Sequence, residues 1–359
     1  MEYAARGQTL HMTSPALVAV ITSIQPPTTS MRTLAGVLAA SGSTVLVIGD
    51  ERGPVEYDLP RAEFVAFADQ VKLPFRLAKL LPSGHYARKN IGYLLAFARS
   101  FACIYETDDD NAPTEKWRIR SEVTPCQKLK PRRWANVYRL FSKDLIWPRG
   151  FPLNRVADND TFHHETNAPT QELPCPIQQG LADLSPDVDA VWRLLLDREH
   201  YFAGFQSVWL PPGTWCPFNS QSTWWWPAAY PLMYLPSFCS FRMTDIWRSF
   251  VAQRCLWELN YGLVFHPPEV VQERNKHDLM KDFEQEVPGY MQNEQITKVL
   301  DSVALRSGRQ EVAANVLRCY ETLIEKNLLS TRELPLIRAW VADLELLDSS
   351  ASRPPTARR

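Results

Sequence analysis

The sequence Phe101-Ala-Cys-Ile-Tyr-Glu-Thr-Asp-Asp-Asp-Asn111 joins a short apolar run to three consecutive aspartates. The run from Phe101 to Tyr105 predicts a buried strand, because it is short and apolar and turn residues soon follow. Side chains two residues apart in a strand point to the same face. Asp108 and Asp110 are therefore expected to converge, while Asp109 turns away. Such a pair suits Mg²⁺ or Mn²⁺; the alternative is a solvated turn that ends the strand.

Strands and helices alternate on the N-terminal side of this stretch. Buried strands are expected over residues 17–21, 44–48 and 63–67, and helices over 29–40 and 87–100. This alternation predicts a mostly parallel sheet with helices on its faces. Ligands of such sheets bind beyond the carboxyl ends of the strands, where Thr22, Asp50 and the aspartates all fall.

The rest of the chain changes character twice. Residues 114–240 mix short strands with long loops, and a helix over 244–262 and a strand over 263–265 follow. Helices with few aromatic residues are then expected over 279–286, 294–305, 310–326 and 330–347. The sequence thus predicts a loose leader over 1–15, an α/β domain over 16–275, a helical module over 276–348 and a disordered tail over 349–359.

Composition and charge restrict the classes of function. The 39 Lys and Arg residues nearly balance the 40 Asp and Glu residues, so no footprint for nucleic acid or an anionic membrane is visible. Seven cysteines without a C-x-x-C spacing or a secretory signal indicate a reducing compartment, and we expect a cytoplasmic protein. The apolar stretch at residues 16–21 is too short to cross a bilayer, so no membrane span is expected.

A series of short motifs resembles the STELLO glycosyltransferase-like proteins and, more distantly, the reversibly glycosylated polypeptides, which include the UDP-arabinopyranose mutases. The motifs lie in the same order in these families, at residues 18–24, 47–50, 87–93, 105–110, 147–153, 185–189, 210–214, 243–247 and 262–266. Both resemblances cover about residues 16–275, whereas the helical module to about residue 347 resembles STELLO alone.

The resemblance implies a GT-A glycosyltransferase fold that binds a nucleotide diphosphate sugar through a divalent metal, Mn²⁺ or Mg²⁺. Cleavage of the sugar–diphosphate bond develops negative charge on the leaving phosphate, which such an ion neutralises. Asp108 and Asp110 would hold the ion. His266, at the end of a strand before two prolines, matches the position of a third ligand. Without the resemblance, a hydrogen-bonded structural histidine is the simpler interpretation.

The donor nucleotide is expected to meet residues at three places. Asp50 could accept hydrogen bonds from a base or ribose hydroxyl, and Thr22 and Ser23 could line the base. Arg88 and Lys89 open a helix, where cations oppose the macrodipole, and a bound diphosphate would explain their placement. Strand-end turns and an ordinary solvated helix start are the alternatives.

The sugar is expected to meet further acidic residues and one arginine. Asp187 and Asp189 could bind sugar hydroxyls together with Asp109, although a proline-initiated turn explains the pair almost as well. Asp245 would be a general base in an inverting enzyme or a hydroxyl ligand in a retaining one, and helix capping is its alternative role. Arg149 matches the sugar-carrying arginine of the reversibly glycosylated polypeptides. Because a protonated guanidinium is a poor nucleophile, a clamp on pyrophosphate or acceptor is favoured over self-glycosylation, and a structural salt bridge is the third option.

The leading hypothesis is a metal-dependent, retaining glycosyltransferase that moves a hexosyl or pentosyl group from a UDP-sugar to a glycan, protein or small-molecule acceptor. The second is a UDP-sugar mutase or self-glycosylating protein, which is put in doubt because Arg155 falls one residue short of the usual spacing after Arg149. The third is a non-catalytic module of the same fold that binds a protein partner through residues 276–348. STELLO proteins are anchored in the Golgi, and this location does not carry over to a sequence without an apparent membrane span.

Overall fold

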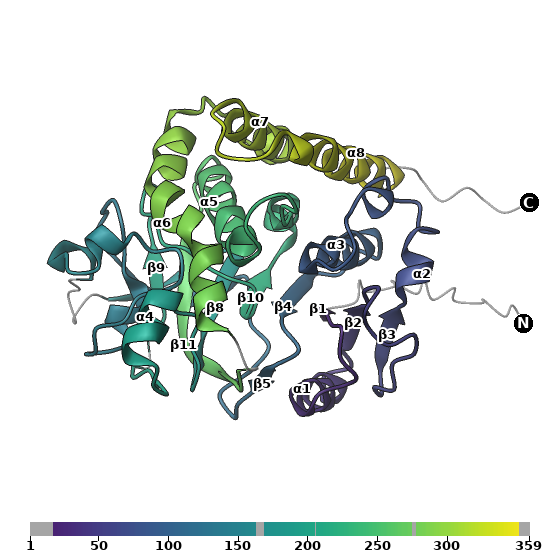
Figure 1. The fold of residues 1–359 in the computed structure, drawn as a ribbon, viewed down its shortest axis with the longest axis horizontal. Coiled ribbons are helices and arrows are strands. Elements are labelled where there is room, and N and C mark those ends of the chain that lie inside the picture. Colours follow the sequence, from purple (N-terminus) through teal and green to yellow (C-terminus); the bar gives the residue numbers. More distant parts are fainter. Residues whose placement is uncertain (1–16, 163–168, 205, 275–277, 352–359) are drawn as a thin grey trace, which may run out of the picture.

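The computed structural model describes residues 17–162, 169–204, 206–274 and 278–351, whose centre is a mixed β-sheet (Figure 1). Within these residues the sheet has 11 strands in the order β3-β2-β1-β4-β10-β8-β11-β9-β6-β7, with β5 paired to β11. The strands are β1 (Leu17–Thr22), β2 (Thr44–Ile48), β3 (Ala62–Val65), β4 (Cys103–Thr107), β5 (Asn111–Pro113), β6 (Val123–Lys128), β7 (Thr170–Pro174), β8 (Ile177–Asp183), β9 (Val208–Leu210), β10 (Ser222–Trp225) and β11 (Leu263–Gln272).

Eight α-helices lie within the described ranges. They are α1 (Thr29–Ala40), α2 (Phe67–Gln70), α3 (Lys89–Ala98), α4 (Ala190–Leu196), α5 (Thr244–Trp257), α6 (Leu279–Ser302), α7 (Val312–Glu325) and α8 (Leu334–Ala351). None of these helices is both long enough and apolar enough to cross a bilayer.

The strands predicted in the N-terminal part form a parallel half-sheet. β3, β2, β1 and β4 pair in parallel, so their carboxyl ends meet at one edge. β10 then enters between β4 and β8 in the antiparallel direction, and β8 pairs in parallel with β11. The predicted α/β architecture, with a mixed, mostly parallel sheet flanked by helices and a C-terminal helical part, is confirmed.

Alternating side chains of β1 explain why helices cover both faces of this half-sheet. Leu17, Ala19 and Ile21 pack with α1, whereas Val18 and Val20 belong to the cluster that contains α3. Gly92 lets α3 approach closely, since a Cβ there would lie 2.5 Å from a Val20 methyl carbon.

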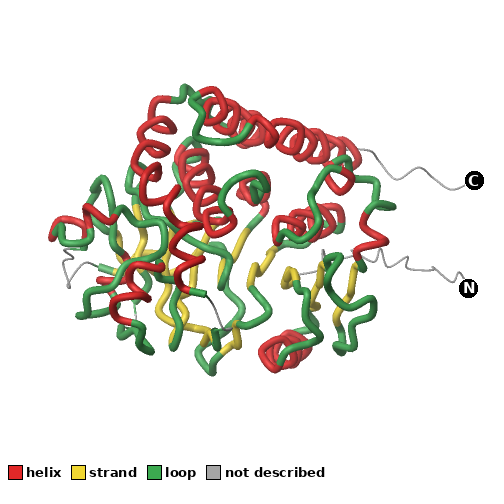
Figure 2. The backbone as a smooth tube through the Cα atoms, viewed as in Figure 1, coloured by secondary structure: helices red, strands yellow, loops and turns green. Residues whose placement is uncertain are grey.

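The C-terminal helices pack on the same side of the sheet as α3 and α5 (Figure 2). Buried Ile296, Leu323 and Trp340, from α6, α7 and α8, join one cluster with Val20 and Ile48 of the parallel half-sheet. The hydrophobic core is therefore continuous across residue 275, where the sequence predicted a domain boundary. The boundary itself stays a prediction, and the predicted leader and most of the predicted tail lie outside the described residues.

Two elements differ from those expected. The helices predicted over 279–286 and 294–305 are a single helix, α6, with Pro288 in its interior. Packing of α6 on α4, α5 and α7 outweighs the local cost of a proline. The strand predicted over 263–265 continues as β11 to Gln272, through Pro267 and Pro268, because register shifts beside the prolines absorb their missing N–H groups.

Candidate functional site

A cleft of about 470 Å³ lies beyond the carboxyl ends of β1, β2 and β4. Most of the residues singled out in the sequence line it: Thr22, Ser23, Asp50, Asp108, Asp109, Asp110, Arg149, Asp187 and Asp245. These residues come from six separate parts of the chain. The polar ends of the predicted strands therefore border the cleft, although the orientation of each side chain was not predicted.

The three aspartates occupy a turn between β4 and β5. β4 ends at Thr107, and the Asn111 amide lies 3.4 Å from the Asp108 carbonyl oxygen, so the triplet is not extended. Strand geometry predicts that Asp109 turns away from the cleft. In this turn it lines the cleft instead. Its carboxylate accepts a hydrogen bond of 2.5 Å from the Ser23 hydroxyl, and Asp110 accepts one of 3.0 Å from the Gln272 amide.

The triplet carries more negative charge than its surroundings neutralise. Lys89, fully buried at the start of α3, donates to an Asp108 carboxylate oxygen at 2.6 Å and to the Thr107 carbonyl at 2.9 Å. Burial raises the pKa of Asp108 against the opposing effect of Lys89, and burial also raises the pKa of Asp109. Burial and the neighbouring Asp108 raise the pKa of Asp110 to about 7. A divalent cation would relieve this repulsion, so the donor set fits one.

The triplet would not form a complete metal site by itself. Over the described residues, no group of three or more His, Cys, Asp or Glu side chains is arranged to hold a metal ion. Mg²⁺ and similar ions are often held by one or two carboxylates with the remaining positions filled by water and substrate phosphates. Asp108 and Asp110 match that pattern of binding.

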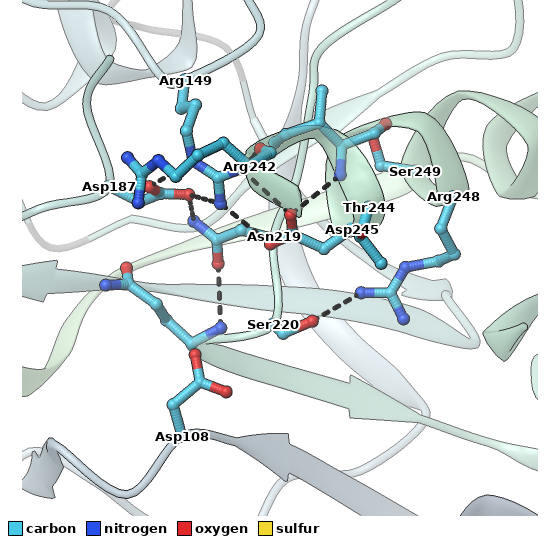
Figure 3. A network of polar contacts seen from close by, with 12 residues as sticks. Asp108, Arg149, Asp187, Asn219, Ser220, Arg242, Thr244, Asp245, Arg248 and Ser249 are labelled. Atoms are coloured by element: carbon cyan, nitrogen blue, oxygen red, sulfur yellow. Dashed lines mark hydrogen bonds and ion pairs between the residues drawn. The ribbon is translucent and has the colours of Figure 1, made fainter. Parts of the chain in front are cut away.

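Arg149 lies between two carboxylates (Figure 3). Its Nε and Nη2 donate to both oxygens of Asp187 at 2.7 and 2.8 Å, and Nη1 and Nη2 donate to both oxygens of Asp245 at 3.0 and 2.9 Å. Burial alone would lower the pKa of Arg149, but the two carboxylates outweigh it and hold that pKa well above the ordinary value. The same contact holds the pKa of Asp245 below its usual range despite burial. Of the three roles considered for Arg149, this geometry is that of the structural salt bridge.

Asp245 belongs to the first turn of α5 and is not the N-cap residue, which is Met243. Its backbone N–H donates to the Tyr86 hydroxyl at 3.0 Å, and that hydroxyl lies 3.2 Å from an Asp245 carboxylate oxygen. The capping interpretation of Asp245 is therefore replaced by a contact that joins α5 to the loop before α3.

Arg88 and Asp189, which were expected to bind the nucleotide sugar, do not line the cleft and have structural partners instead. Arg88 donates to the Gln70 side chain at 2.7 Å and to the Leu81 carbonyl at 3.0 Å, so it joins α2 to the segment before α3. Asp189 caps α4 by accepting from the Trp192 amide at 2.9 Å, and its other oxygen accepts from the Trp147 indole at 2.6 Å. Asp187 lines the cleft, whereas Asp189 is the N-cap residue of α4 and does not line it. The two carboxylates therefore do not converge as predicted.

His266 is not at the cleft, and the prediction of a third metal ligand there is wrong. It is fully buried within β11, with Nδ1 2.6 Å from the Ser207 hydroxyl and Nε2 2.9 Å from the Gln178 side-chain oxygen. Burial lowers the pKa of His266 well below its ordinary value. Because β11 continues through the two prolines, its carboxyl end reaches the cleft at Gln272 instead.

Several residues that line the cleft were not predicted from the sequence. Gln272 and Arg274 reach the cleft from the end of β11, and Arg193, Arg242 and Phe241 line it as well. Extension of the strand past the prolines would have placed the first two at its carboxyl end. The remaining three depend on how α4 and α5 are placed, which no local pattern reveals.

Comparison with known proteins agrees with the resemblance seen in the motifs. Residues 242–352 match the family model of the STELLO glycosyltransferases, a region that begins at the cleft with Arg242 and includes α5 to α8. Two Arabidopsis thaliana proteins, "Probable glycosyltransferase STELLO2" and "Probable glycosyltransferase STELLO1", are each 26% identical to this chain over 351 residues. The alignments cover 90% of this chain and 44% of each relative, so the chain spans less than half the length of the curated proteins it matches. The chain is therefore similar to the STELLO glycosyltransferases over most of its own length.

Proposed function

We propose that this protein is a glycosyltransferase that uses a UDP-sugar with Mn²⁺ or Mg²⁺ and transfers the sugar with retention of configuration. The observation that carries the proposal is the cleft itself. One chamber joins the polar ends of β1 and β2, an acidic triplet with surplus negative charge, and the paired carboxylates Asp187 and Asp245. A nucleoside, a metal-bound diphosphate and a sugar need these three environments in this order.

The nucleoside would lie against the ends of β1 and β2. Asp50 accepts hydrogen bonds from the backbone N–H groups of Gly84 and His85, both at 2.9 Å, so it fixes a loop that lines the cleft. Burial lowers the pKa of His85 to about 4, so its ring is uncharged at physiological pH. The His85 ring and the side chain of Ile24 offer surfaces against which a planar base can pack.

The diphosphate would lie at the acidic triplet. Asp108 and Asp110 would hold the ion, which when bound compensates the charge that develops on the departing diphosphate. Lys89 keeps Asp108 in position through its hydrogen bonds, and Gln272 does the same for Asp110. Ser23 holds Asp109, whose remaining oxygen is able to accept a hydrogen bond from a ribose or sugar hydroxyl.

The state of Asp245 supports retention. A general base works best with a pKa near the working pH and with a free oxygen facing the acceptor. Arg149 engages both oxygens of Asp245 and keeps its pKa low, so Asp245 is poorly suited to remove a proton. The same contacts argue against glycosylation of Arg149, because its nitrogens already donate to two carboxylates.

Thermal unfolding with UDP and Mn²⁺ tests the proposal. At a ligand concentration of 100 Kd, binding stabilises the native state by about 2.7 kcal/mol, which raises the Tm by roughly 4 °C for a chain of this size. We expect the double variant Asp108→Asn/Asp110→Asn to lose this shift. The matched control is Asp69→Asn, which removes a solvent-exposed partner of Lys72 that does not line the cleft. No shift in the wild-type protein, or an undiminished shift in the double variant, would contradict the proposal.

A panel of UDP-sugars then identifies the donor and the stereochemistry. Slow hydrolysis releases a free sugar, whose anomeric configuration proton NMR reports before mutarotation. Transfer forms a glycoside, whose anomeric configuration is fixed and is read by the same method. We expect the configuration of the donor to be kept. An inverted product would refute retention while leaving donor binding intact.

A further inference from the structure

Three arginines form a second polar end of the cleft. Arg193 comes from α4, Arg242 precedes α5, and Arg274 follows β11, and all three line the same chamber. Guanidinium groups stay protonated in proteins, so their charges meet in the cleft. No motif of the sequence brought them together.

The three arginines differ in how their charge is compensated. Arg242 pairs with Glu286 at 2.8 Å, and Arg274 pairs with Asp282 at 2.8 Å, both carboxylates belonging to α6. Arg193 is only 4% exposed and donates to the Pro186 carbonyl at 2.7 Å, with its face over the Trp192 ring. Across the described ranges, no carboxylate lies within ion-pair distance of Arg193. A buried guanidinium thus borders the cleft without an ion-pair partner.

One carboxylate of the cleft that acts electrostatically on Arg193, that of Asp187, is already engaged. Both oxygens of Asp187 accept from Arg149, and one also accepts from the Asn219 amide at 2.8 Å. Burial, followed by the charge of Arg274, lowers the pKa of Arg193 to about 10. Burial, followed by the charge of Arg242, likewise lowers the pKa of Arg274. A neighbouring anion would relieve the repulsion among these arginines.

We propose that Arg193 and Arg274 form an anion subsite that binds a phosphate or carboxylate group of the substrate. The identity of that substrate as a nucleotide sugar rests on the proposed function. Asp187, which also lines the cleft, acts electrostatically on both arginines. An anionic group on the transferred sugar is one source of such an anion, and the donor diphosphate is the other.

Titration of matched ligands separates the two sources. Calorimetry with Mn²⁺ compares UDP, UDP-glucose and UDP-glucuronate, of which the last two differ by one sugar carboxylate. A charge-assisted hydrogen bond contributes about 1.5 to 3 kcal/mol, so Arg193→Gln should weaken the affected ligand about tenfold or more. Loss confined to UDP-glucuronate assigns the subsite to an anionic sugar. Equal loss for all three assigns it to the diphosphate.

The controls guard against a general loss of structure. Arg198→Gln removes a nearby arginine that is half-exposed and pairs with Asp144, and it should leave all affinities unchanged. Arg193→Lys keeps the charge and should recover part of the lost affinity, and Arg274→Gln should reproduce the effect of Arg193→Gln. Unfolding curves confirm that each variant is folded before it is titrated.

Failure of the subsite and failure of the proposed function give different results. Normal UDP binding with all ligands within twofold of wild type in both Arg193→Gln and Arg274→Gln overturns the subsite alone. If the wild-type protein binds no UDP, titration with inorganic pyrophosphate and with free glucuronate shows whether the anion subsite exists without the proposed donor. Binding of either that depends on Arg193 keeps the subsite and removes the donor, whereas no binding of any of these anions overturns both.

Discussion

Glu106 and Arg248 form a fully buried ion pair directly behind the candidate site. Glu106 lies two residues before the acidic triplet and accepts from the Trp225 indole and from Arg248, at 2.9 and 3.0 Å. Arg248 lies one helical turn after Asp245 and also donates to the Ser220 hydroxyl at 3.1 Å. The pair therefore joins the strand that bears the triplet to the helix that bears Asp245.

Removal of the charge on Glu106 should be strongly destabilising. Glu106→Gln keeps the shape of the side chain but leaves Arg248 buried without a counter-ion, which costs about 3 to 5 kcal/mol. Urea denaturation measures the loss. The control Glu63→Gln breaks a pair with Arg99 that is exposed at the surface, and it should change the free energy of unfolding by less than about 1 kcal/mol. Equal effects of the two substitutions would show that the buried pair does not hold these elements together.

Single residues were placed correctly in the cleft where the end of the strand before them was predicted correctly. Thr22 and Asp50 were placed in the cleft because β1 and β2 end as predicted. His266 was misplaced because two prolines were taken as the end of a strand that continues. Arg193 had no local signature, because its position in the cleft depends on the packing of α4.

At the scale of elements, the start of α4 contains a carboxyl group with an unusual pKa. Burial, against the hydrogen bonds from Trp192 and Trp147, raises the pKa of Asp189 to about 7. An unfolded aspartate has a pKa of about 3.9. Between those pH values the unfolded carboxyl has lost its proton and the folded one has not.

The contribution of Asp189 to the free energy of unfolding should therefore fall as pH rises from about 4 to 7. The slope from this group is at most about 1.4 kcal/mol per pH unit, and the fall should level off above pH 7. Asp189→Asn removes the titrating group and should flatten the profile in that window. Asparagine accepts only one of the two hydrogen bonds, so the comparison concerns the slope and not the absolute free energy. Urea denaturation at several pH values measures the slope of the free energy of unfolding against pH. A variant profile parallel to that of the wild type would contradict the assignment.

Elements with local signals were predicted well, and those that depend on distant packing were not. α1 occupies residues 29–40 and β2 residues 44–48, as predicted, because apolar periodicity and turn residues define both. α6 was divided in two at Pro288, since the packing that keeps it whole involves α4 and α5. The triplet was assigned strand geometry, whereas β4 is shifted by two residues and the aspartates form a turn.

At the scale of the whole molecule, the C-terminal helices are bound to the α/β part by polar as well as apolar contacts. Asp343 of α8 accepts from the backbone N–H groups of Arg76 and Leu77, both at 2.9 Å. Glu333, also buried, accepts from the backbone N–H groups of Ser237 and Phe238. These carboxylates fix loops that would otherwise carry unsatisfied backbone donors.

The described ranges should consequently unfold in one transition. Two independent modules would give separate transitions, whereas a shared core couples their stabilities. Scanning calorimetry compared with far-UV circular dichroism measures this, and we expect coincident midpoints. A separate transition for residues 276–348, identified by hydrogen exchange, would instead support the domain boundary predicted from the sequence.

The order of strands in the sheet also governs how the chain folds during synthesis. β1, β2 and β4 follow one another closely and are able to pair early, but the open edge of β4 is covered only by β10. Tyr105 of β4 contacts Ser222 of β10 across 117 positions of sequence. Until that segment leaves the ribosome, β4 presents unpaired backbone groups beside an incomplete core, a state that favours association between nascent chains. Completion of the sheet is thus tied to translation of the second half of the chain, and chaperone protection is most valuable in that interval.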